Sequence, residues 1–306
     1  MSNKLIKAIK DPKKALLYAM NKGMFDFLSD KAYLKLRFRL IMGRKPDLND
    51  PTTYNEKLQW LKLNNRRAEY TMMVDKYRVR EYIAKTIGEE YLIPLIGIWD
   101  REEDIDFEKL PERFVLKCNH NSGLGMYICR DKSKLDVEKV RKELRRGMEQ
   151  NYYLRGREWP YKNVPRKIIA EQFMEDASTG ELRDYKFFCF DGRVKALFVA
   201  TERQKLGEEV KFDYFDAEYN HLNLKQEHPN AKHVPEKPLY FDKMKELAEK
   251  ISRDIPHLRV DFYEANGKIY FGECTFYHLS GMAEFYPNEW DEIFGSWLKL
   301  PNSKEE

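Results

Sequence analysis

The sequence has few cysteines, and none of them stands in a metal-binding pair. Its four cysteines, Cys118, Cys129, Cys189 and Cys274, are far apart and lie in strand-like runs without a CxxC spacing. This distribution favours buried free thiols over disulfides or a zinc site. Cys274 and His278 form a lone C-x3-H spacing, which by itself defines no metal site.

Long hydrophobic runs are also missing. The longest nearly apolar stretch, YLIPLIGIW, is too short to cross a bilayer. A charged fraction of 35% and a mean hydropathy of -0.74 argue in the same direction. The first residues lack the apolar core and small-residue cleavage site of a secretory signal, and no repeat or low-complexity linker interrupts the chain. We therefore expect a cytoplasmic protein.

What the sequence does contain is a globular composition, with 306 residues of which 42% are hydrophobic and 14% aromatic. This length allows roughly two domains or one multi-lobed domain. Helices are expected after the capping box of Thr53 and Glu56, over 70–87 with Gly88 as its end, near 136–150 and near 240–252. Strands are expected within 91–99, 113–119, 125–130 and 167–174, in a hairpin over 184–201 that turns at Asp191 and Gly192, and in a second hairpin over 258–276. Mixed strands and helices indicate an α+β fold.

The positive charge is concentrated at the N-terminal end. Residues 1–45 contain 12 basic and 3 acidic side chains, so the remainder of this chain of net charge +4 has a balance of -5. Lysines and apolar residues alternate there in a way that fits either a helix on an anionic membrane surface or a helix packed on the body of the protein. The lysines are Lys4, Lys7, Lys10, Lys13 and Lys14. Nucleic acid is a poorer partner, because basic residues do not dominate elsewhere.

The hairpin LRVDFYEANGKIYFGECTF carries one carboxylate on each strand, Asp261 and Glu273. A two-residue loop would point these two side chains to opposite faces of the sheet. A three-residue loop would set Arg259 opposite Glu273 and make Asp261 a diagonal neighbour, roughly 7–8 Å away, which one magnesium ion can span. We expect the three-residue loop, with Thr275 on the same face. The alternative is an ion cluster in which Arg259 compensates Glu273.

Two further segments have the residue types of a nucleotide site. In FVLKCNHNSGLGMYI, Lys117 precedes a loop with Gly123 and Gly125, whose backbone N–H groups could enclose phosphate oxygens. The loop is neither a Walker A motif nor a dinucleotide fingerprint, and a plain hairpin turn is the alternative. In IIAEQFMEDASTGELRDYKFF, Glu171 and the backbone of residues 172–174 suit a purine edge, with Phe173 or Met174 over its face.

Asp184 and Lys186 alternate onto one face of the following strand. There they suit a ribose hydroxyl and a phosphate, and a surface ion pair is the alternative. The segment 151–166 between these regions is aromatic, basic and irregular, which is typical of a substrate-facing loop or of a connector.

The order of these segments resembles the ATP-grasp fold, in which two α+β lobes enclose ATP. The sequence is most similar to the teichuronopeptide-biosynthesis (TupA-like) ATP-grasp family over roughly residues 35–300. The segments that carry the resemblance are NDPTTYNEKLQWLKL, DKYRVREYI, FVLKCNHNSG, IIAEQF, DYKFFCFDG and GECTF. The resemblance implies a basic helical segment over 1–45, an N-terminal subdomain over 46–110, a central lid over 111–175 and a C-terminal core over 176–306.

The resemblance also implies roles for individual residues. The ATP phosphates would bind at Lys117, Asn119, Ser122, Gly123 and Gly125, the adenine at Glu171, Gln172, Phe173 and Met174, and the ribose at Asp184. Mg²⁺ would bind at Asp261, Glu273 and Thr275. Lys117, Lys186 and Arg259 would offset charge during phosphoryl transfer, and Lys76, Arg203, His278 and Ser280 would approach the substrate. Thr275 replaces the asparagine of many relatives, and FYHLSGM replaces their glycine-rich turn.

The resemblance implies an ATP-dependent ligase that joins a carboxylate to an amine through an acylphosphate. The family's association with bacterial surface polysaccharides, including capsules and the cell envelope, implies a uronic acid or glycan as one substrate and an amino acid or amino alcohol as the other. Such work would take place in the cytoplasm or at the inner face of the cytoplasmic membrane. The alternatives are a metal-dependent glycosyltransferase, although no DxD motif ends a strand, and a polysaccharide-binding protein without catalytic activity.

Overall fold

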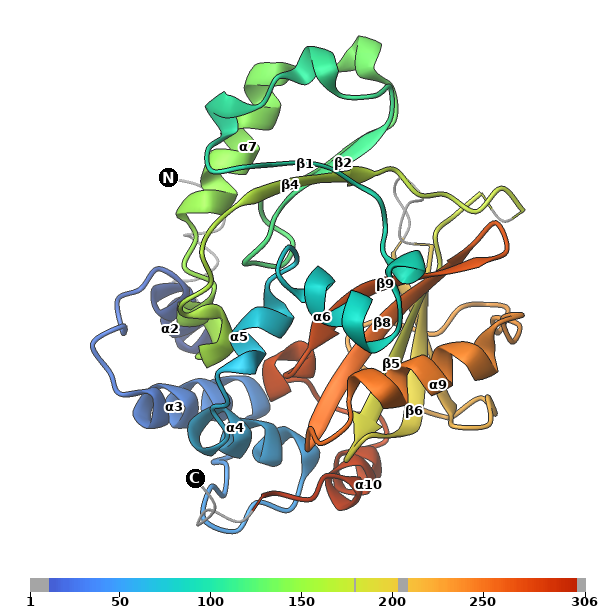
Figure 1. The fold of residues 1–306 in the computed structure, drawn as a ribbon. Coiled ribbons are helices and arrows are strands. Elements are labelled where there is room, and N and C mark those ends of the chain that lie inside the picture. Colours follow the sequence, from blue (N-terminus) through green and yellow to red (C-terminus); the bar gives the residue numbers. More distant parts are fainter. Residues whose placement is uncertain (1–10, 179, 203–208, 302–306) are drawn as a thin grey trace.

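Two antiparallel sheets and a set of N-terminal helices make up the protein in a computed structural model, which describes residues 11–178, 180–202 and 209–301 (Figure 1). The helices are α2 (Pro12–Asn21), α3 (Asp30–Met42), α4 (Tyr54–Asn64), α5 (Glu69–Val74), α6 (Val79–Thr86), α7 (Val137–Glu149), α8 (Tyr153–Gly156), α9 (Phe241–Ile251) and α10 (Glu289–Trp297). The strands are β1 (Leu95–Trp99), β2 (Phe114–Cys118), β3 (Met126–Cys129), β4 (Ile168–Gln172), β5 (Asp184–Phe190), β6 (Arg193–Thr201), β7 (Lys211–Asp216), β8 (His257–Ala265) and β9 (Lys268–Thr275).

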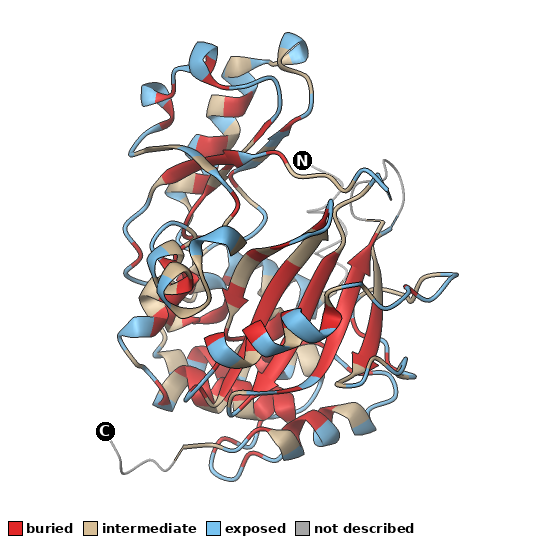
Figure 2. Ribbon diagram, turned by 45° about the vertical axis from the view of Figure 1, so that its right-hand side comes forward, coloured by how far each residue is buried: buried red, intermediate tan, exposed pale blue. Residues whose placement is uncertain are grey.

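The large sheet has the strand order β7-β6-β5-β8-β9 and forms most of the core (Figure 2). Helix α9 covers one face, where Phe187 of β5 lies 6.0 Å from Phe241, measured between ring centroids. On the other face, Phe188 and Phe190 contact Tyr54 of α4 and Phe294 of α10. Because side chains alternate along a strand, this second face also holds the polar side chains farther along β5 and β8.

The small sheet has the order β1-β4-β2-β3 and is covered on one face by α7. Val140 and Leu144 of α7 pack there against Phe114 and Leu116 of β2. The opposite face turns toward the large sheet and α6 (Figure 1). The pairing of β1 with β4 starts this sheet at Leu95, whereas the sequence predicted its lobe to begin at residue 111. Strand pairs so distant in the chain leave no local signal in the sequence.

The helix expected over 70–87 is wrong, because two helices form there with a break over 75–78. Asp75 ends α5 in an extended conformation, and its Oδ1 accepts the backbone N–H groups of Tyr77 (2.9 Å) and Arg78 (3.2 Å). The carboxylate therefore competes with the helical hydrogen bonds of this turn. As a result, Lys76 lies in a loop near the small sheet instead of on a helix surface.

Most other expected elements are present, including the capping box of Thr53 and Glu56 and the turn at Asp191 and Gly192. Strand β7 and helix α10 were not predicted. Lys4, Lys7 and Lys10 lie outside the described residues, while Lys13 and Lys14 are exposed on α2. None of the helices among the described residues is long and apolar enough to span a membrane.

Two glycines allow the loop after β2 to pack against α7. A Cβ on Gly147 of α7 would lie 2.8 Å from the Cys118 sulfur and would overlap the Cα of Gly125. Asn121 Nδ2 also donates to the Gly147 carbonyl at 2.9 Å. The loop thus depends on this close backbone approach.

We predict that Gly147→Ala lowers the free energy of unfolding by about 1–3 kcal/mol, because the added methyl overpacks this contact. Helix propensity alone would predict a gain of up to about 1 kcal/mol from the same change. Chemical denaturation shows whether the free energy of unfolding falls or rises. Lys142→Ala, an exposed change on the same helix, should stay within about 0.5 kcal/mol of the wild type. A stabilised Gly147→Ala protein would contradict the close packing.

Candidate functional site

The two carboxylates of the last hairpin face one another directly, although the predicted loop is wrong. Ala265 pairs with Lys268, so the loop has only two residues, Asn266 and Gly267, both with positive φ. Alone, this loop would point Asp261 and Glu273 to opposite faces. A β-bulge adds one residue at Gly272 and restores the shared face, and there Asp261 lies opposite Glu273. Arg259 is opposite Thr275 instead of Glu273.

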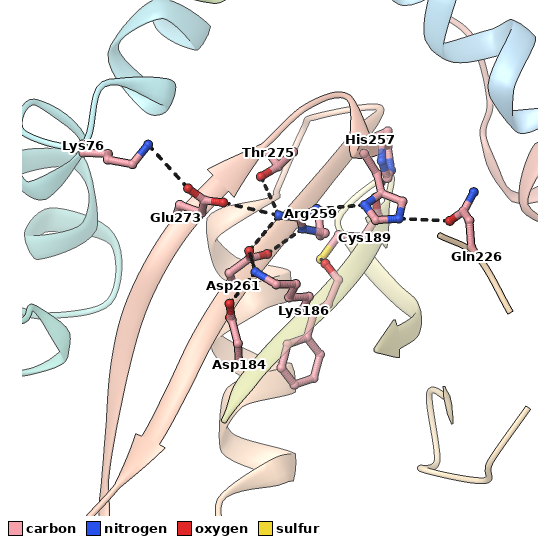
Figure 3. A network of polar contacts seen from close by, with 12 residues as sticks. Lys76, Asp184, Lys186, Cys189, Gln226, His257, Arg259, Asp261, Glu273 and Thr275 are labelled. Atoms are coloured by element: carbon pink, nitrogen blue, oxygen red, sulfur yellow. Dashed lines mark hydrogen bonds and ion pairs between the residues drawn. The ribbon is translucent and has the colours of Figure 1, made fainter. Parts of the chain in front are cut away.

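Arg259 is the centre of the polar cluster on this face (Figure 3). Its Nε and Nη2 donate to the two oxygens of Asp261 at 2.7 and 2.8 Å. Nη2 also donates to Thr275 Oγ1 at 2.9 Å and approaches Glu273 Oε1 at 3.4 Å. The side chain of Arg259 is 9% exposed, so the guanidinium makes these contacts in a largely dry environment. The bidentate geometry fixes the Asp261 carboxylate.

Lys186 extends the cluster to β5. Its ammonium group contacts the carboxylate of Asp261 and lies 2.6 Å from that of Asp184. Asp184 and Asp261 are both almost fully buried. Buried carboxylates need compensating charge, which Lys186 and Arg259 provide. The ion cluster considered as an alternative is therefore present, and it contains the residues expected to bind metal and phosphate.

His278 positions Arg259, and it is not among the residues that line the cavity next to Glu273. Its side chain is buried, and Nδ1 accepts from Arg259 Nη1 at 2.8 Å. Because a guanidinium only donates, the ring proton lies on Nε2, which donates to Gln226 Oε1 at 3.0 Å. Burial and the charge of Arg259 lower the pKa of His278 well below its ordinary value. The structure therefore places His278 away from the substrate position expected from the sequence.

The small sheet presents Lys117 and Glu171 on its uncovered face, with 2.6 Å between Nζ and Oε2. Arg80 of α6 lies 3.8 Å from the other oxygen of Glu171 and was not foreseen as a site residue. Met126 and Ile128 pair with Lys117 and Val115 across β2 and β3, so they share this face, and both are partly exposed. The alternation of side chains in RFVLKC and GMYIC already predicts that these residues share one face of the sheet.

The loop after β2 meets the large sheet through Lys76. Lys76 Nζ donates to the Asn121 carbonyl at 2.8 Å and lies 3.5 Å from Glu273 Oε2. Ser122 lines a cavity next to Glu273, and Gly123 has open space around it. These loop residues are open to a ligand.

Other predicted nucleotide residues are engaged elsewhere. Asn119 is fully buried, with its amide bound to Asp75, the Pro165 carbonyl and the backbone of Lys167. Gly125 packs on α7, and its N–H donates to Glu143. Both residues shape the loop.

The end of β4 and the segment after it are partly engaged within the protein, since the backbone N–H of Gln172 donates to the Pro94 carbonyl at 3.0 Å. The ring of Phe173 lies between the guanidinium groups of Arg113 and Arg130, at 4.9 and 5.1 Å, and is almost fully buried. Phe173 therefore does not cover a purine as its side chain stands. Gln172 is exposed and Met174 is half-buried.

Two predicted substrate residues remain. Ser280 lines the cavity with a positive φ of 58°, and its Oγ accepts from Lys62 Nζ at 2.9 Å. Arg203 lies outside the described residues.

The charges around Glu273 keep it ionised. Burial alone would raise its pKa, but Lys76, Lys186 and Arg259 outweigh this effect and lower the pKa to about 2. Lys117 of the small sheet contributes in the same direction. Cations from four different segments thus act on one carboxylate.

The carboxylate pair fits a magnesium ion that is also bound by phosphate. Among the described residues, no group of three His, Cys, Asp or Glu side chains could hold a metal ion. Asp261 and Glu273 supply two carboxylates on one face, with the Thr275 hydroxyl beside them. Mg²⁺ typically takes one or two protein carboxylates and completes its octahedron with water and substrate phosphates.

We predict that Glu273→Gln changes the dependence of stability on pH. In the wild type, the pKa of Glu273 is lowered from 4.5 to about 2, so its ionised form stabilises the fold above pH 4.5 and this contribution disappears as the pH falls toward 2. Between these values the wild type should lose more unfolding free energy than Glu273→Gln, as measured by urea titration. Lys76→Met should reduce the difference. A difference that is constant across this range would contradict the assigned electrostatics.

Comparisons with known proteins come from three sources. A search of curated proteins gave no match. Among solved structures, the D-alanine--D-alanine ligase from Bacillus anthracis complexed with ATP is 15% identical, with 67% of this chain and 54% of that chain covered and a TM-score of 0.39. This chain thus spans about half the length of that enzyme.

Two further structures are similar at the same level. The D-alanine-D-alanine ligase from Helicobacter pylori is 14% identical over 81% of this chain and 69% of that one, with a TM-score of 0.43. The N5-carboxyaminoimidazole synthase from Aspergillus clavatus is 16% identical over 76% and 52%, with a TM-score of 0.41. The model of the family described as TupA-like ATPgrasp matches residues 56–299, which include the small sheet, the large sheet and the whole polar cluster, and the chain therefore belongs to the TupA-like ATP-grasp family.

Proposed function

We propose that this ATP-grasp ligase forms an amide between a uronic-acid carboxylate of a surface polysaccharide or its precursor and an amino acid or amino alcohol. One observation carries the proposal. Lys117 of the small sheet acts on Glu273 of the large sheet, Ser122 of the loop after β2 lines the same cavity as Glu273, and Lys76 contacts both sides. A nucleotide triphosphate with Mg²⁺ needs cations and carboxylates in this arrangement.

In this proposal the nucleotide lies between the two sheets. Val115, Met126 and Ile128 give the adenine an apolar surface beside Lys117. Glu171 and the backbone of residues 172–174 supply hydrogen bonds to its edge, and Asp184 binds the ribose. The phosphates lie at Lys117 and at the N–H groups around Ser122 and Gly123.

The metal would be held by Asp261 and Glu273, with Thr275 or a water beside them. When bound, Mg²⁺ neutralises phosphate charge and orients the γ-phosphoryl group. Lys186 contacts Asp261. With the metal bound to Asp261, the ammonium group of Lys186 would be available to the phosphates. Arg259 keeps its contact with His278 and stabilises negative charge on the transferring group.

The reaction proceeds in two transfers. An oxygen of the substrate carboxylate attacks the γ-phosphorus, the bond from that phosphorus to the bridging oxygen breaks, and ADP leaves. The lone pair of the amine then attacks the acyl carbon, the bond between that carbon and the phosphate oxygen breaks, and the amine proton leaves with phosphate. Binding both substrates in one orientation supplies much of the rate increase, and no protein nucleophile is needed.

The place of this reaction is proposed to be the cytoplasm, next to the membrane where lipid-linked glycans are assembled. The basic segment 1–45 supports contact with anionic lipid, and Lys13 and Lys14 are exposed within it.

We predict that the wild type binds Mg-ATP with micromolar affinity in isothermal calorimetry. Asp261→Asn combined with Glu273→Gln should weaken binding at least tenfold, because the metal loses both carboxylates. Lys117→Met should weaken binding similarly through the phosphates. Lys109→Met, which changes an exposed lysine on the surface of the small lobe, should bind like the wild type.

Phosphate release with panels of uronic acids and amines then tests the chemistry. Release that needs ATP, an acid and an amine together supports the ligase. Binding of UDP-sugars with indifference to ATP would contradict it and favour the glycosyltransferase.

A further inference from the structure

A cavity of about 530 Å³ opens beside the polar cluster, and it is lined both by residues of the proposed metal and phosphate site and by residues of other segments. Arg259, Glu273 and Thr275 line it at the large sheet, and Ser122 lines it at the glycine loop. Its size falls within the range that holds small-molecule ligands, roughly 300–1,000 Å³. The cavity therefore has room for a substrate next to the reacting phosphate.

Two arginines lie on its wall, one from a segment that the sequence did not connect with the site and one from the segment 151–166, which was expected to be a substrate-facing loop or a connector. Arg37 lies on α3 and Arg155 on α8, and both line the cavity. Burial is the main cause of the lowered pKa of Arg37, Tyr33 acts in the opposite direction, and the charge of Arg155 makes a smaller contribution that lowers it. Arg37 Nη1 donates to Asn21 Oδ1 at 2.9 Å. Within the described ranges, neither arginine forms an ion pair with a carboxylate.

Two nearby arginines, in contrast, lie next to carboxylates. Arg66 pairs with Asp30 at 2.8 Å, and Arg157 lies 3.4 Å from Asp26. Arg37 and Arg155 have the same charge, and among the described residues neither forms such an ion pair. Guanidinium groups that line one cavity can donate to a carboxylate or a phosphate bound there.

The acidic residues of the cavity do not cancel this charge. Glu158 is buried, and Lys62 acts on it more strongly than Arg155 does. Lys62 Nζ itself donates to the Gly156 carbonyl and to Ser280 Oγ, both at 2.9 Å. Glu227 also lines the cavity and is exposed to solvent.

Aromatic residues complete the wall. Tyr152 and Tyr161 line the cavity with ring centroids 4.7 Å apart. Glu273 and Arg259 line the same cavity as the two rings, and the charge of Glu158 acts on both tyrosines more strongly than the charges of Glu273 and Arg259 do. Aromatic surface beside charged donors suits a sugar ring with anionic substituents.

We propose that Arg37 and Arg155 bind a second anionic group of the acid substrate, a carboxylate or a phosphate, while its reacting carboxylate lies at Arg259. The inference rests on the proposed function, because it takes this cavity to hold the acid. The protein would then select sugar acids with two anionic groups over those with one.

Calorimetry on the full chain, with Mg²⁺ and a non-hydrolysable ATP analogue, tests this selectivity. The probes are glucuronic acid 1-phosphate and glucaric acid, which carry two anionic groups, and glucuronic acid and glucose 1-phosphate, which carry one ionised carboxylate or phosphate group. The wild type should bind at least one of the first two about tenfold tighter than both single-group probes. Whichever probe binds tighter identifies the second group as phosphate or carboxylate.

Arg37→Gln and Arg155→Gln should each remove most of this tenfold preference and leave the affinity for the nucleotide unchanged. Arg39→Gln is the matched control, because it makes the same change on the same helix at an exposed residue that does not line the cavity. Unfolding curves check that every variant is folded.

A wild type without the preference, or variants that keep it, would overturn the inference even if ATP binds. If instead the nucleotide fails to bind while the preference still depends on both arginines, the arginine site stands and the proposed ligase is wrong.

Discussion

The site depends on one constraint, the register of the hairpin formed by β8 and β9. Side chains alternate along a strand, so one residue more or less between the turn and Glu273 decides which face receives this carboxylate. The bulge at Gly272 supplies that residue. A Cβ on Gly272 would lie 3.1 Å from the Asp261 carbonyl oxygen, so the absence of a side chain permits the close approach of the two strands. Without the bulge, Arg259, Asp261 and Glu273 would not meet.

In the resulting cluster, cationic side chains compensate the negative charge of the carboxylates. Asp184 and Asp261 are buried beside Lys186 and Arg259, while Glu273 has Lys76 in addition. This balance offsets the buried negative charge in a sheet face whose other end is filled by Phe188 and Phe190. The residues of this ion cluster are the ones that the proposed function assigns to the metal and the phosphates.

The sequence was sufficient for the two-lobed α+β architecture and for most residues of the cluster, because alternation and turn signals are local. It was insufficient where contacts between residues far apart in the chain determine the local structure. The loop length was wrong because a bulge compensated for it, and the single helix over 70–87 was wrong because Asp75 caps the following turn. His278 was expected at the substrate, but its partners Arg259 and Gln226 become neighbours only in the fold. Arg37 was missed for the same reason, while Arg155 lies in the segment 151–166 that was expected to be a substrate-facing loop or a connector.

The break between α5 and α6 has a mechanical consequence. The backbone N–H of Lys76 donates to the Asn119 carbonyl, and its Nζ donates to the Asn121 carbonyl, so one residue latches the glycine loop at two points. The helices on both sides of Lys76 are anchored in the core of the large sheet through Met73, Val74, Val79 and Ile83. Any movement of the small lobe away from the large one must break these two hydrogen bonds of Lys76. The contact between the two lobes thus runs through the same lysine whose ammonium group lies 3.5 Å from Glu273.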